Sequence, residues 1–599
     1  MLQRHSLLSI IIMLLLCSLA HGQKYSYYDF DPVVITGTRI PTEFSNSSRN
    51  INVISREDIQ EQNAASITDL LQNITDLEFK TRGPLGVQSD VSIRGSSGEQ
   101  TLVLIDGMKI SDPQTAHHSM NIPVNLEDVK QIEILKGNAS KIYGPNALGG
   151  VINIITKNAE KANASVSLAG GEYGYRKTGF SYSQPINNFT NRLSFSEKVS
   201  DGYMDNTDFL VRNVFYKAGL NTKKVQYDLS LGYQKKEFGA NKFYTPSPTE
   251  RENTEQFLAN FNAFMPTQWG HLTMKISGRR NYDHFLIPEY KYINKHTTRM
   301  IATEITGLYE SKHFSINFGS DIGYSDIFGM QMNHHRARAG LFAETIVEIT
   351  DKLTLSPGIS GYYYENWGTQ FFPGIDAGYQ LTKNVRLFSS IGRSFRVPSF
   401  TDLFYSGVAN MGNADLKPEK ALSGEFGGRI TKNKLQTSIT LFHRNTTDMI
   451  DFARTDTSMV FVAMNVPKLK TSGLEVSCEY QLNILTLHSL RFNYSYFNHR
   501  EQLDEYQLKN QLNSLTQRWS FNASQRLPKQ LHINWTFRYS ERVFDKGTGS
   551  LITDFQSQIP LGNFNIYLKI DNLFNTKYNN FLGRPMPGRW TTFGIKYKF

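Results

Sequence analysis

Cysteine is nearly missing from this sequence: only Cys17 and Cys478 occur among its 599 residues. Cys17 belongs to an apolar run over residues 7–19, which follows Arg4 and ends in small residues. A short apolar run between a basic start and a small-residue exit predicts a secretory signal peptide, here residues 1–22. Its removal leaves Cys478 alone, so the exported chain forms no intramolecular disulfide.

Other features are also missing, and each absence excludes a class of protein. Hydrophobic residues make up 39% of the chain and the mean hydropathy is −0.39, which excludes a polytopic helical membrane protein. The net charge of +10 is spread along the chain without a basic run, so the sequence indicates no nucleic-acid partner. Gly-x-Ser-x-Gly, His-Glu-x-x-His and phosphate-loop motifs do not occur, so we expect no enzyme.

What the sequence does have is strict alternation of apolar and polar residues. Over residues 593–599 four apolar side chains share one face of a strand, while Gly594, Lys596 and Lys598 share the other. The same alternation recurs over residues 533–540 and 564–570. One aromatic-rich face and one polar face is what a lipid-facing barrel with a polar interior requires. A soluble β-sandwich also alternates, so the turns must decide between the two.

Short polar turns divide residues 162–599 into segments of about 40 residues, each able to hold two spanning strands of roughly 9–11 residues. The turns lie at residues 187–188, 222–224, 267–270, 310–312, 350–352, 382–384, 431–433, 482–483, 528–530 and 561–563. Longer loops are expected near residues 235–256, 283–300, 325–336, 396–418, 446–470, 498–514 and 576–588. Short turns on one side and long loops on the other are typical of outer-membrane barrels.

The segment count predicts an all-β membrane protein, a 22-stranded antiparallel outer-membrane β-barrel over residues 158–599. The turns before residue 350 are weakly marked, so counts of 20 or 24 strands stay open. Residues 38–157 differ, because Ser55 and Ser66 each begin a helix-capping pattern and short apolar strands with glycine turns follow. This pattern predicts an N-terminal α+β plug domain that fits in the barrel lumen.

Several stretches of the sequence resemble motifs of one known protein family. They are Ser-Ile-Arg-Gly at 92–95, Val-Leu-Ile-Asp-Gly at 103–107, Ile-Glu-Ile-Leu-Lys-Gly at 132–137, residues 142–157, Ser-Phe-Arg-Val-Pro-Ser at 394–399, Asn-Ala-Asp-Leu-Lys-Pro-Glu at 413–419 and residues 571–578. In these motifs the chain resembles the TonB-dependent outer-membrane receptors. The resemblance implies active transport of a scarce large nutrient across the bacterial outer membrane by a monomeric barrel in lipid, with no required cofactor. It also implies TonB of the inner-membrane TonB–ExbB–ExbD complex as partner, and allows a surface lipoprotein.

The segment before the plug, within the periplasmic residues 23–37, resembles the TonB box of that family. Its residues are Asp31, Pro32, Val33, Val34, Ile35, Thr36 and Gly37. A periplasmic partner that captures a segment by strand addition requires it to be extended and unpaired. The β-branched residues favour extension and the proline disfavours helix.

Within the family, the plug most resembles the cobalamin transporter branch, whose apical plug loops correspond to residues 83–89 and 112–120. The resemblance implies ligand contacts from Leu85, Gly86, Gln88, Ser89, Gln114, Thr115, His117, His118, Ser119 and Met120. His117 and His118 could ligate a cargo metal or form a hydrogen-bonded pair within the plug. We therefore expect a corrinoid or another metal chelate as cargo.

Haem or a ferric siderophore is the alternative cargo, and a passive porin or an outer-membrane enzyme is the alternative of a different class. Haem receptors of this family typically carry a histidine between the Phe-Arg-x-Pro and Asn-x-Asp-Leu motifs. Residues 399–412 contain none, which favours a corrinoid over haem. Separately, Asp201, Asp205 and Asp208 lie in an expected extracellular loop and could bind Ca²⁺, although scattered loop carboxylates are more often only solvated.

Overall fold

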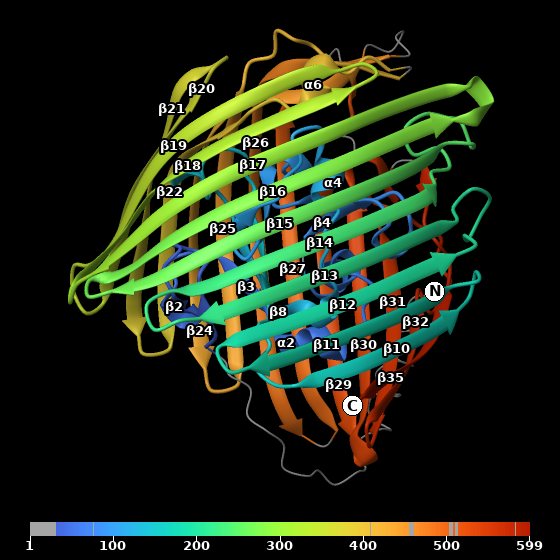
Figure 1. Ribbon diagram of the computed structural model, residues 1–599, viewed down its shortest axis with the longest axis horizontal. Coiled ribbons are helices and arrows are strands. Elements are labelled where there is room, and N and C mark those ends of the chain that lie inside the picture. The colour runs from blue at the N-terminus through green and yellow to red at the C-terminus, as the bar shows by residue number, and fades with distance from the viewer. Residues whose placement is uncertain are drawn as a thin grey trace.

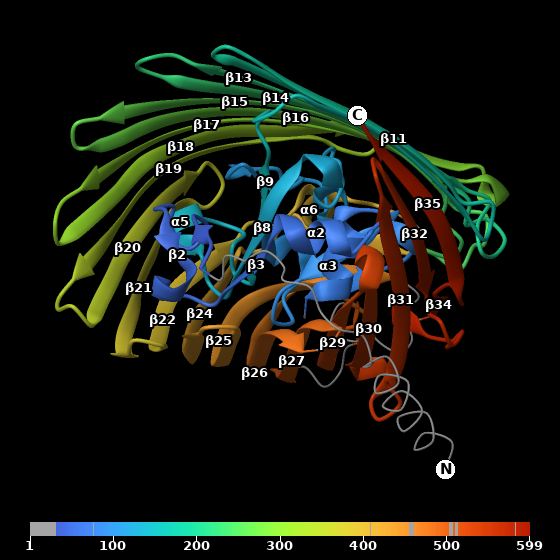
Figure 2. The same cartoon turned by 90° about the horizontal axis from the view of Figure 1, so that it is seen from below.

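The computed structural model describes residues 31–75, 77–407, 409–454, 460–484, 486–501, 507–509, 513–581 and 583–599. The predicted signal peptide lies outside the described residues. Within them, one closed β-barrel surrounds a smaller N-terminal domain (Figures 1 and 2). No helix in the described part of the chain is long and apolar enough to cross a membrane.

Twenty-two antiparallel strands of the described residues form the barrel wall. They are β10 Asn163–Gly171, β11 Arg176–Ile186, β12 Phe189–Ser200, β13 Phe209–Asn221, β14 Gln226–Gly239, β15 Arg251–Thr267, β16 Gly270–Ile287, β17 Tyr292–Glu310, β18 Phe314–Gly329, β19 Asn333–Glu348, β20 Leu353–Tyr364, β21 Gly368–Thr382, β22 Val385–Arg396, β24 Glu419–Lys432, β25 Leu435–Arg454, β26 Phe461–Ile484, β27 Leu487–Glu501, β29 Leu515–Leu527, β30 Leu531–Arg542, β31 Ser550–Leu561, β32 Phe564–Asp571 and β35 Trp590–Lys598. The first and last of these pair, with Val166 opposite Tyr597, and close the barrel.

Short elements in the loops complete this part of the chain. They are the strands β23 Asn410–Met411, β28 Gln507–Leu508, β33 Asn579–Phe581 and β34 Arg584–Pro585, the helix α6 Phe400–Phe404, and the 3-10 turns η5 Pro288–Tyr290, η6 Pro528–Gln530 and η7 Val543–Asp545. Nine of the ten predicted turns include residues between two neighbouring wall strands, as between β11 and β12 or β31 and β32. The turn predicted at 482–483 instead falls within the end of β26, which continues to Ile484. The predicted strand count of 22 is therefore confirmed.

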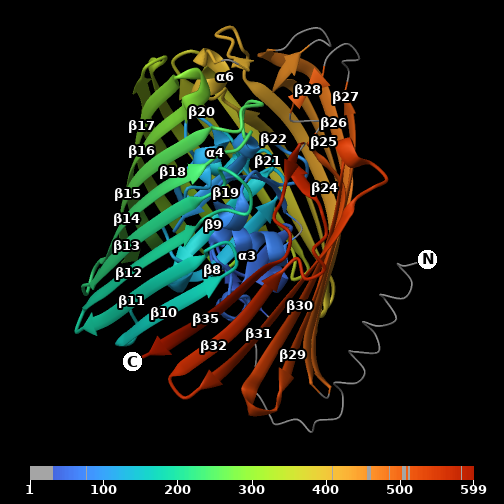
Figure 3. The ribbon, with the colours of Figure 1, turned by 90° about the vertical axis from the view of Figure 1, so that its right-hand side faces the viewer.

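The strands are longer than the sequence predicted. β17 has 19 residues and β26 has 24, where roughly 9–11 residues are enough to span a bilayer. The loop expected over 283–300 is consequently reduced to residues 288–291, because both flanking strands continue into it. On the long-loop side the wall extends above α4 and surrounds the top of the plug (Figure 3).

The two faces of the wall differ in polarity as predicted. Large apolar side chains face outward, among them Ile322, Leu341 and Phe371, which are 63%, 69% and 63% exposed. Polar side chains such as Asn281 and Thr471 face inward and are buried between the wall and the plug. An apolar outer band of this kind places the barrel in the outer membrane.

The plug occupies the lumen, as Figure 2 shows from below. Its elements are β1 Val33–Val34, β2 Thr42–Glu43, η1 Phe44–Asn46, β3 Ile51–Ile54, α2 Arg56–Glu61, α3 Ile67–Ile74, β4 Glu78–Thr81, η2 Pro84–Gly86, β5 Ser89–Ser92, η3 Gly98–Gln100, β6 Thr101–Ile105, β7 Met108–Lys109, α4 Ala116–Ser119, η4 Leu126–Asp128, β8 Val129–Lys136, α5 Ser140–Tyr143 and β9 Gly150–Thr156. Five of them form a mixed sheet in the order β3-β8-β9-β6-β7. Ser55 and Ser66 cap α2 and α3, as the sequence predicted.

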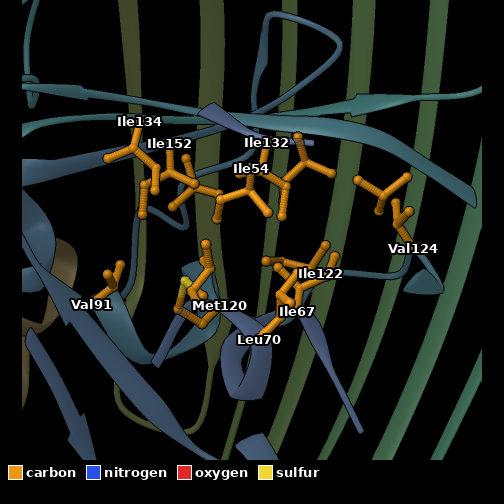
Figure 4. Close-up of a cluster of buried hydrophobic side chains, with 14 of the residues drawn as sticks. Ile54, Ile67, Leu70, Val91, Met120, Ile122, Val124, Ile132, Ile134 and Ile152 are labelled. Atoms are coloured by element: carbon orange, nitrogen blue, oxygen red, sulfur yellow. The ribbon is translucent and has the colours of Figure 1, made fainter. Parts of the chain in front are cut away.

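The plug has an apolar core and also meets the wall through buried charges. Ile132, Ile134 and Ile152 of the sheet pack against Ile67 and Leu70 of α3 (Figure 4). Phe215 of β13 and Leu258 of β15 belong to the same apolar cluster, so the wall contributes to this core. At the interface the wall also presents carboxylates to plug cations. The plug is therefore docked in the lumen by both apolar and polar contacts.

Arg94, in the Ser-Ile-Arg-Gly motif, makes the best-connected of these contacts. Its guanidinium lies 2.6 Å from Glu425 and 2.8 Å from Glu475, and all three side chains are at most 5% exposed. Lys141 of α5 lies 2.6 Å from Glu344 and 2.7 Å from Asp376 in the same way. Removing one partner of such a buried pair leaves an uncompensated charge, which is costly.

Candidate functional site

The long-loop end of the barrel carries a cavity of about 170 Å³ between the plug and the wall. Its lining comes from the plug around residues 80–90 and from α4, and from the loop residues 243–245 and 399–410 above them. In Figure 3, α4 lies beneath α6 at this end. Because outer-membrane barrels keep their short turns in the periplasm, this cavity faces the outside of the cell.

Asp90 organises the plug side of the cavity. Its Oδ2 lies 2.9 Å from Nη1 of Arg82, and its Oδ1 is paired with Nδ1 of His117. Burial opposes ionisation, but His117 and Arg82 hold the pKa of Asp90 well below its usual range. Burial lowers the pKa of His117. Because an ionised carboxylate can only accept, Nδ1–H of His117 is the donor in its contact with Asp90. A carboxylate that fixes one ring nitrogen leaves Nε2 as a lone-pair donor, as in many metal-binding histidines.

The loop after β22 holds the apical plug loop from above. The backbone N–H of Phe400 donates to the carbonyl of Pro113 (2.9 Å), and that of Thr401 donates to the carbonyl of Gln114 (3.2 Å). Ser399 caps α6 and so fixes the direction of these N–H groups. The extracellular loop and the plug loop are therefore joined backbone to backbone.

Two sequence motifs of the barrel meet at a buried arginine. Nε of Arg396, from the Ser-Phe-Arg-Val-Pro-Ser motif, donates to Oε1 of Glu419 (2.8 Å), and its Nη1 donates to Oδ2 of Asp402 (2.9 Å). Glu419 ends the second motif and also accepts from Nε2 of Gln100 in the plug (2.5 Å). The motifs thus fasten the outer loop to both wall and plug.

Of the ligand contacts predicted from the sequence, Gln114, Thr115, His117 and His118 line the cavity. The structure therefore places these four residues of the apical plug loop 112–120 at the outer cavity.

The other predicted contacts are not among the lining residues. Met120 is 5% exposed and lies in the plug core (Figure 4). Leu85 packs on the apolar cluster around Phe243, and a side chain at Gly86 would meet Ser66. These three residues serve plug packing in this state, and their role as ligand contacts stays a prediction.

Three polar residues of the predicted set likewise form hydrogen bonds within the protein. Ser89 donates to Thr81 Oγ1 (3.3 Å), and Ser119 accepts from the backbone N–H of Asp112 (3.0 Å). Gln88 is 5% exposed and its Nε2 is bonded to Tyr244 and Glu252. These contacts stabilise the apical loops, so the residues shape the site without lining it.

Sequence reasoning missed most of the wall side of the cavity. Tyr244, Glu252, Asp283, Arg396, Tyr405 and Lys509 all line it. Arg396 stands inside a recognised motif. The others lie within the long loops expected at residues 235–256, 283–300, 396–418 and 498–514, and that expectation singles out no individual residue.

The three aspartates considered for calcium lie in the loop before β13. Asp201 and Asp205 are exposed and Asp208 is half-buried. Both carboxylate oxygens of Asp208 accept from Arg251, at 2.9 and 2.7 Å, and these hydrogen bonds lower its pKa. Asp208 is therefore already paired, and calcium binding at this loop stays a prediction.

At the periplasmic end, the segment that resembles a TonB box lies against the plug. Val33 and Val34 are extended as expected, but they pair with Glu43 and Thr42, so the segment is not unpaired. Asp31 accepts from the backbone N–H and the hydroxyl of Ser45, both at 2.6 Å. The expectation of a free strand is thus wrong for this state.

A buried carboxylate holds the second half of the same segment. Oε2 of Glu133 accepts from the backbone N–H groups of Ile35 (3.0 Å) and Thr36 (2.7 Å). The segment borders a cavity of about 860 Å³ that opens among the periplasmic turns and is lined by Asp31, Val34 and Gly37, with Pro32 on a neighbouring pocket. A partner protein therefore has space to approach, and must displace these contacts to pair with the strand.

The protein has the features of a gated transporter of the outer membrane. A plug is docked in its closed barrel, a cavity lies at the outer end, and a periplasmic segment borders an open space. Two family models agree with this class: residues 160–591 match "TonB dependent receptor-like, beta-barrel" and residues 44–151 match "TonB-dependent Receptor Plug Domain". The chain belongs to the TonB-dependent receptor family, whose members are transporters and receptors of the outer membrane.

Curated relatives of this chain include vitamin B12 transporters. The vitamin B12 transporter BtuB of Vibrio vulnificus is 25% identical over 70% of this chain and 71% of its own length. The vitamin B12 transporter BtuB of Photobacterium profundum is 23% identical over 92% of both chains.

Similar solved structures include the siderophore receptor PirA of Pseudomonas aeruginosa and the copper transporter OprC. PirA has a TM-score of 0.74 and 17% identity over 92% of this chain and 99% of its own. OprC has a TM-score of 0.79 and 15% identity over the same shares. At these identities the structures establish the shared fold alone.

Proposed function

We propose that this TonB-dependent transporter carries cobalamin or another corrinoid across the outer membrane. The observation that carries the proposal is the agreement, over 92% of both chains, with a vitamin B12 transporter. The solved siderophore and copper proteins are less similar in sequence and support only the fold. The missing histidine between residues 399 and 412 further disfavours haem.

The outer site has the chemistry that a corrinoid needs. Corrinoids are large and carry many amide groups, so their recognition depends on hydrogen-bond donors and acceptors over a wide polar surface. Gln114 and Thr115 supply such groups from the plug loop, and Tyr244 and Tyr405 supply phenol groups from the loops above. The cavity of about 170 Å³ is smaller than such a ligand. The loops above α4 would therefore move outward on binding, a rearrangement that a substantial minority of complexes show.

Energy for transport would come from TonB of the TonB–ExbB–ExbD complex, acting on residues 31–37 as the TonB box. Strand addition to Val33 and Val34 would replace their pairing with Glu43 and Thr42. Because Glu133 holds the adjacent N–H groups inside the plug, a pull on this strand is transmitted to the plug sheet through β8.

The test is a titration of purified protein in detergent with cyanocobalamin, haemin and a ferric catecholate siderophore. Cyanocobalamin is expected to bind at least about 100-fold more tightly than the other two. Gln114→Ala combined with Thr115→Ala should weaken cyanocobalamin binding about tenfold, since a net hydrogen bond contributes roughly 1 kcal/mol. Ser89→Ala, a polar plug residue off the cavity wall, is the matched control and should bind like wild type.

Spectroscopy then separates metal ligation from surface contact. If Nε2 of His117 binds the cobalt of an aquo-corrinoid, His117→Ala removes the shift in the corrinoid absorption spectrum that wild type produces. An unchanged spectrum in that variant would assign His117 to packing beside Asp90. A clear isotherm for haemin or the siderophore without one for cobalamin would overturn the cargo and leave the transporter in place.

A further inference from the structure

On the deep side of the outer cavity, one plug residue and two wall residues bring metal-binding atoms together. His118 of α4, Glu252 of β15 and Asp283 of β16 each offer a ligand atom, and these atoms lie within 4.8 Å of one another. All three side chains are buried, at 3%, 3% and 8% exposure. We propose that a divalent transition-metal ion of the zinc type binds here, between the apical plug helix and the barrel wall.

Unpaired polar atoms around the cluster point to a missing ligand. His296 of β17 lies opposite Asp283 in the strand ladder and is 1% exposed, yet neither of its ring nitrogens has a hydrogen-bond partner. Oδ1 of Asp283 and Oε1 of Gln114 are buried and unpartnered as well. A buried polar atom without a partner is costly. A bound cation would satisfy the nitrogen and oxygen lone pairs together.

The charges of the cluster lead to the same conclusion. Glu252 and Asp283 place two buried carboxylates near one another, and such a pair repels unless it retains a proton or holds a cation. The neighbouring cations are engaged elsewhere: Arg279 pairs with Asp112, and Nζ of Lys236 donates to the carbonyl of Val87 (3.0 Å). Nε2 of His118 stands 3.7 Å from Asp283, too far for a good hydrogen bond. A dication neutralises both carboxylates at once.

The donor set selects the kind of metal. Imidazole nitrogen with carboxylate oxygen suits Zn²⁺ and its neighbours in the first transition row. Ca²⁺ requires about six to eight oxygen ligands, which this cluster does not offer, and soft Cu⁺ prefers sulfur. Because His118 belongs to the plug and the other ligands to the wall, the ion would also fasten α4 in its present position. The site is distinct from the aspartates of the loop before β13.

Metal stoichiometry of the full-length, untagged protein in detergent tests the proposal. The protein is treated with chelator, loaded with Zn²⁺, desalted and analysed for zinc, and Co²⁺ is added separately as a visible-absorption probe. Wild type is expected to retain about one equivalent of zinc and to give intense cobalt d–d bands. His118→Ala and the isosteric Asp283→Asn should lower zinc affinity by at least about 10–100-fold, the range found when residues supporting a metal site are removed.

Two controls make the result decisive. His335→Ala removes an exposed wall histidine and Asp208→Asn removes a loop carboxylate, and both should retain zinc like wild type. Circular dichroism and resistance of the barrel to unfolding in cold dodecyl sulfate verify that each variant is folded. Wild type that retains no more zinc than Asp283→Asn would overturn the proposal, as would equal zinc loss from His118→Ala and His335→Ala.

Discussion

Val34→Pro is expected to abolish cobalamin uptake while cobalamin binding at the cell surface stays at the wild-type level. Proline removes the backbone N–H and fixes φ, so residue 34 can no longer pair as a strand. TonB would capture this segment through main-chain hydrogen bonds, and loss of one donor in so short a strand prevents the capture. Surface binding persists because the outer cavity lies at the opposite end of the plug. The measurement is uptake and surface binding of radiolabelled cyanocobalamin by whole cells.

Two milder variants distinguish the effect of losing the backbone N–H from the effect of losing side-chain packing. Val33 is 52% exposed and Val34 only 2%, so Val33→Ala changes little packing and Val34→Ala loses a buried contact. Both retain their backbone donors and should transport far better than Val34→Pro. Wild-type uptake by Val34→Pro would show that residues 31–37 are not the coupling segment. Equal loss in Val34→Ala and Val34→Pro would assign the effect to packing.

Arg94→Met should loosen the plug from the barrel without unfolding the wall. The substitution keeps an unbranched apolar stem but removes the guanidinium, which leaves Glu425 and Glu475 without their closest cation. Breaking a buried ion pair by removing one partner costs about 3–5 kcal/mol. In calorimetry of the protein in detergent, we expect the plug transition to move to lower temperature while the barrel transition is unchanged, because the wall ladder is closed independently of the plug.

The exposed pair between Arg212 and Glu197 provides the matched control. Their side chains are 47% and 32% exposed on the barrel surface, and Nε of Arg212 lies 2.5 Å from Oε2 of Glu197. Solvated pairs of this kind contribute little to stability, so Arg212→Met should leave both transitions in place. A plug transition of Arg94→Met that coincides with that of Arg212→Met would refute the docking role of the buried charges.

The barrel could be predicted from the sequence because its signals are local. The periplasmic turns are marked by short stretches with polar residues, most clearly after residue 350, and the strands by alternation that a single window reveals. The caps at Ser55 and Ser66 are local in the same sense, and both proved correct. Strand length was underestimated because the alternation of apolar and polar residues stops before the strands do: residues 294–299 of β17 are all polar and residues 461–464 of β26 are all apolar.

The outer site was only half predicted, because its wall side is assembled from distant segments. Asp90 and Tyr244 lie on one cavity with Arg396 and Lys509, and nothing near any of them in sequence indicates the others. Met120 shows what position in a loop does not reveal, because it belongs to the second apical loop but has its side chain in the plug core. The pairing of Val34 with Thr42 could not be predicted either, since an extended segment looks the same whether free or paired.

The most direct test of energy-coupled transport by this plugged barrel is cobalamin uptake with and without a proton-motive force. Cells that express the protein are supplied with radiolabelled cyanocobalamin before and after addition of a protonophore. We predict that uptake collapses to the surface-bound level while surface binding is retained, because the plug stays docked until TonB pulls on residues 31–37. Uptake that continues at the same rate after the proton-motive force is dissipated would contradict the account and indicate a passive pore.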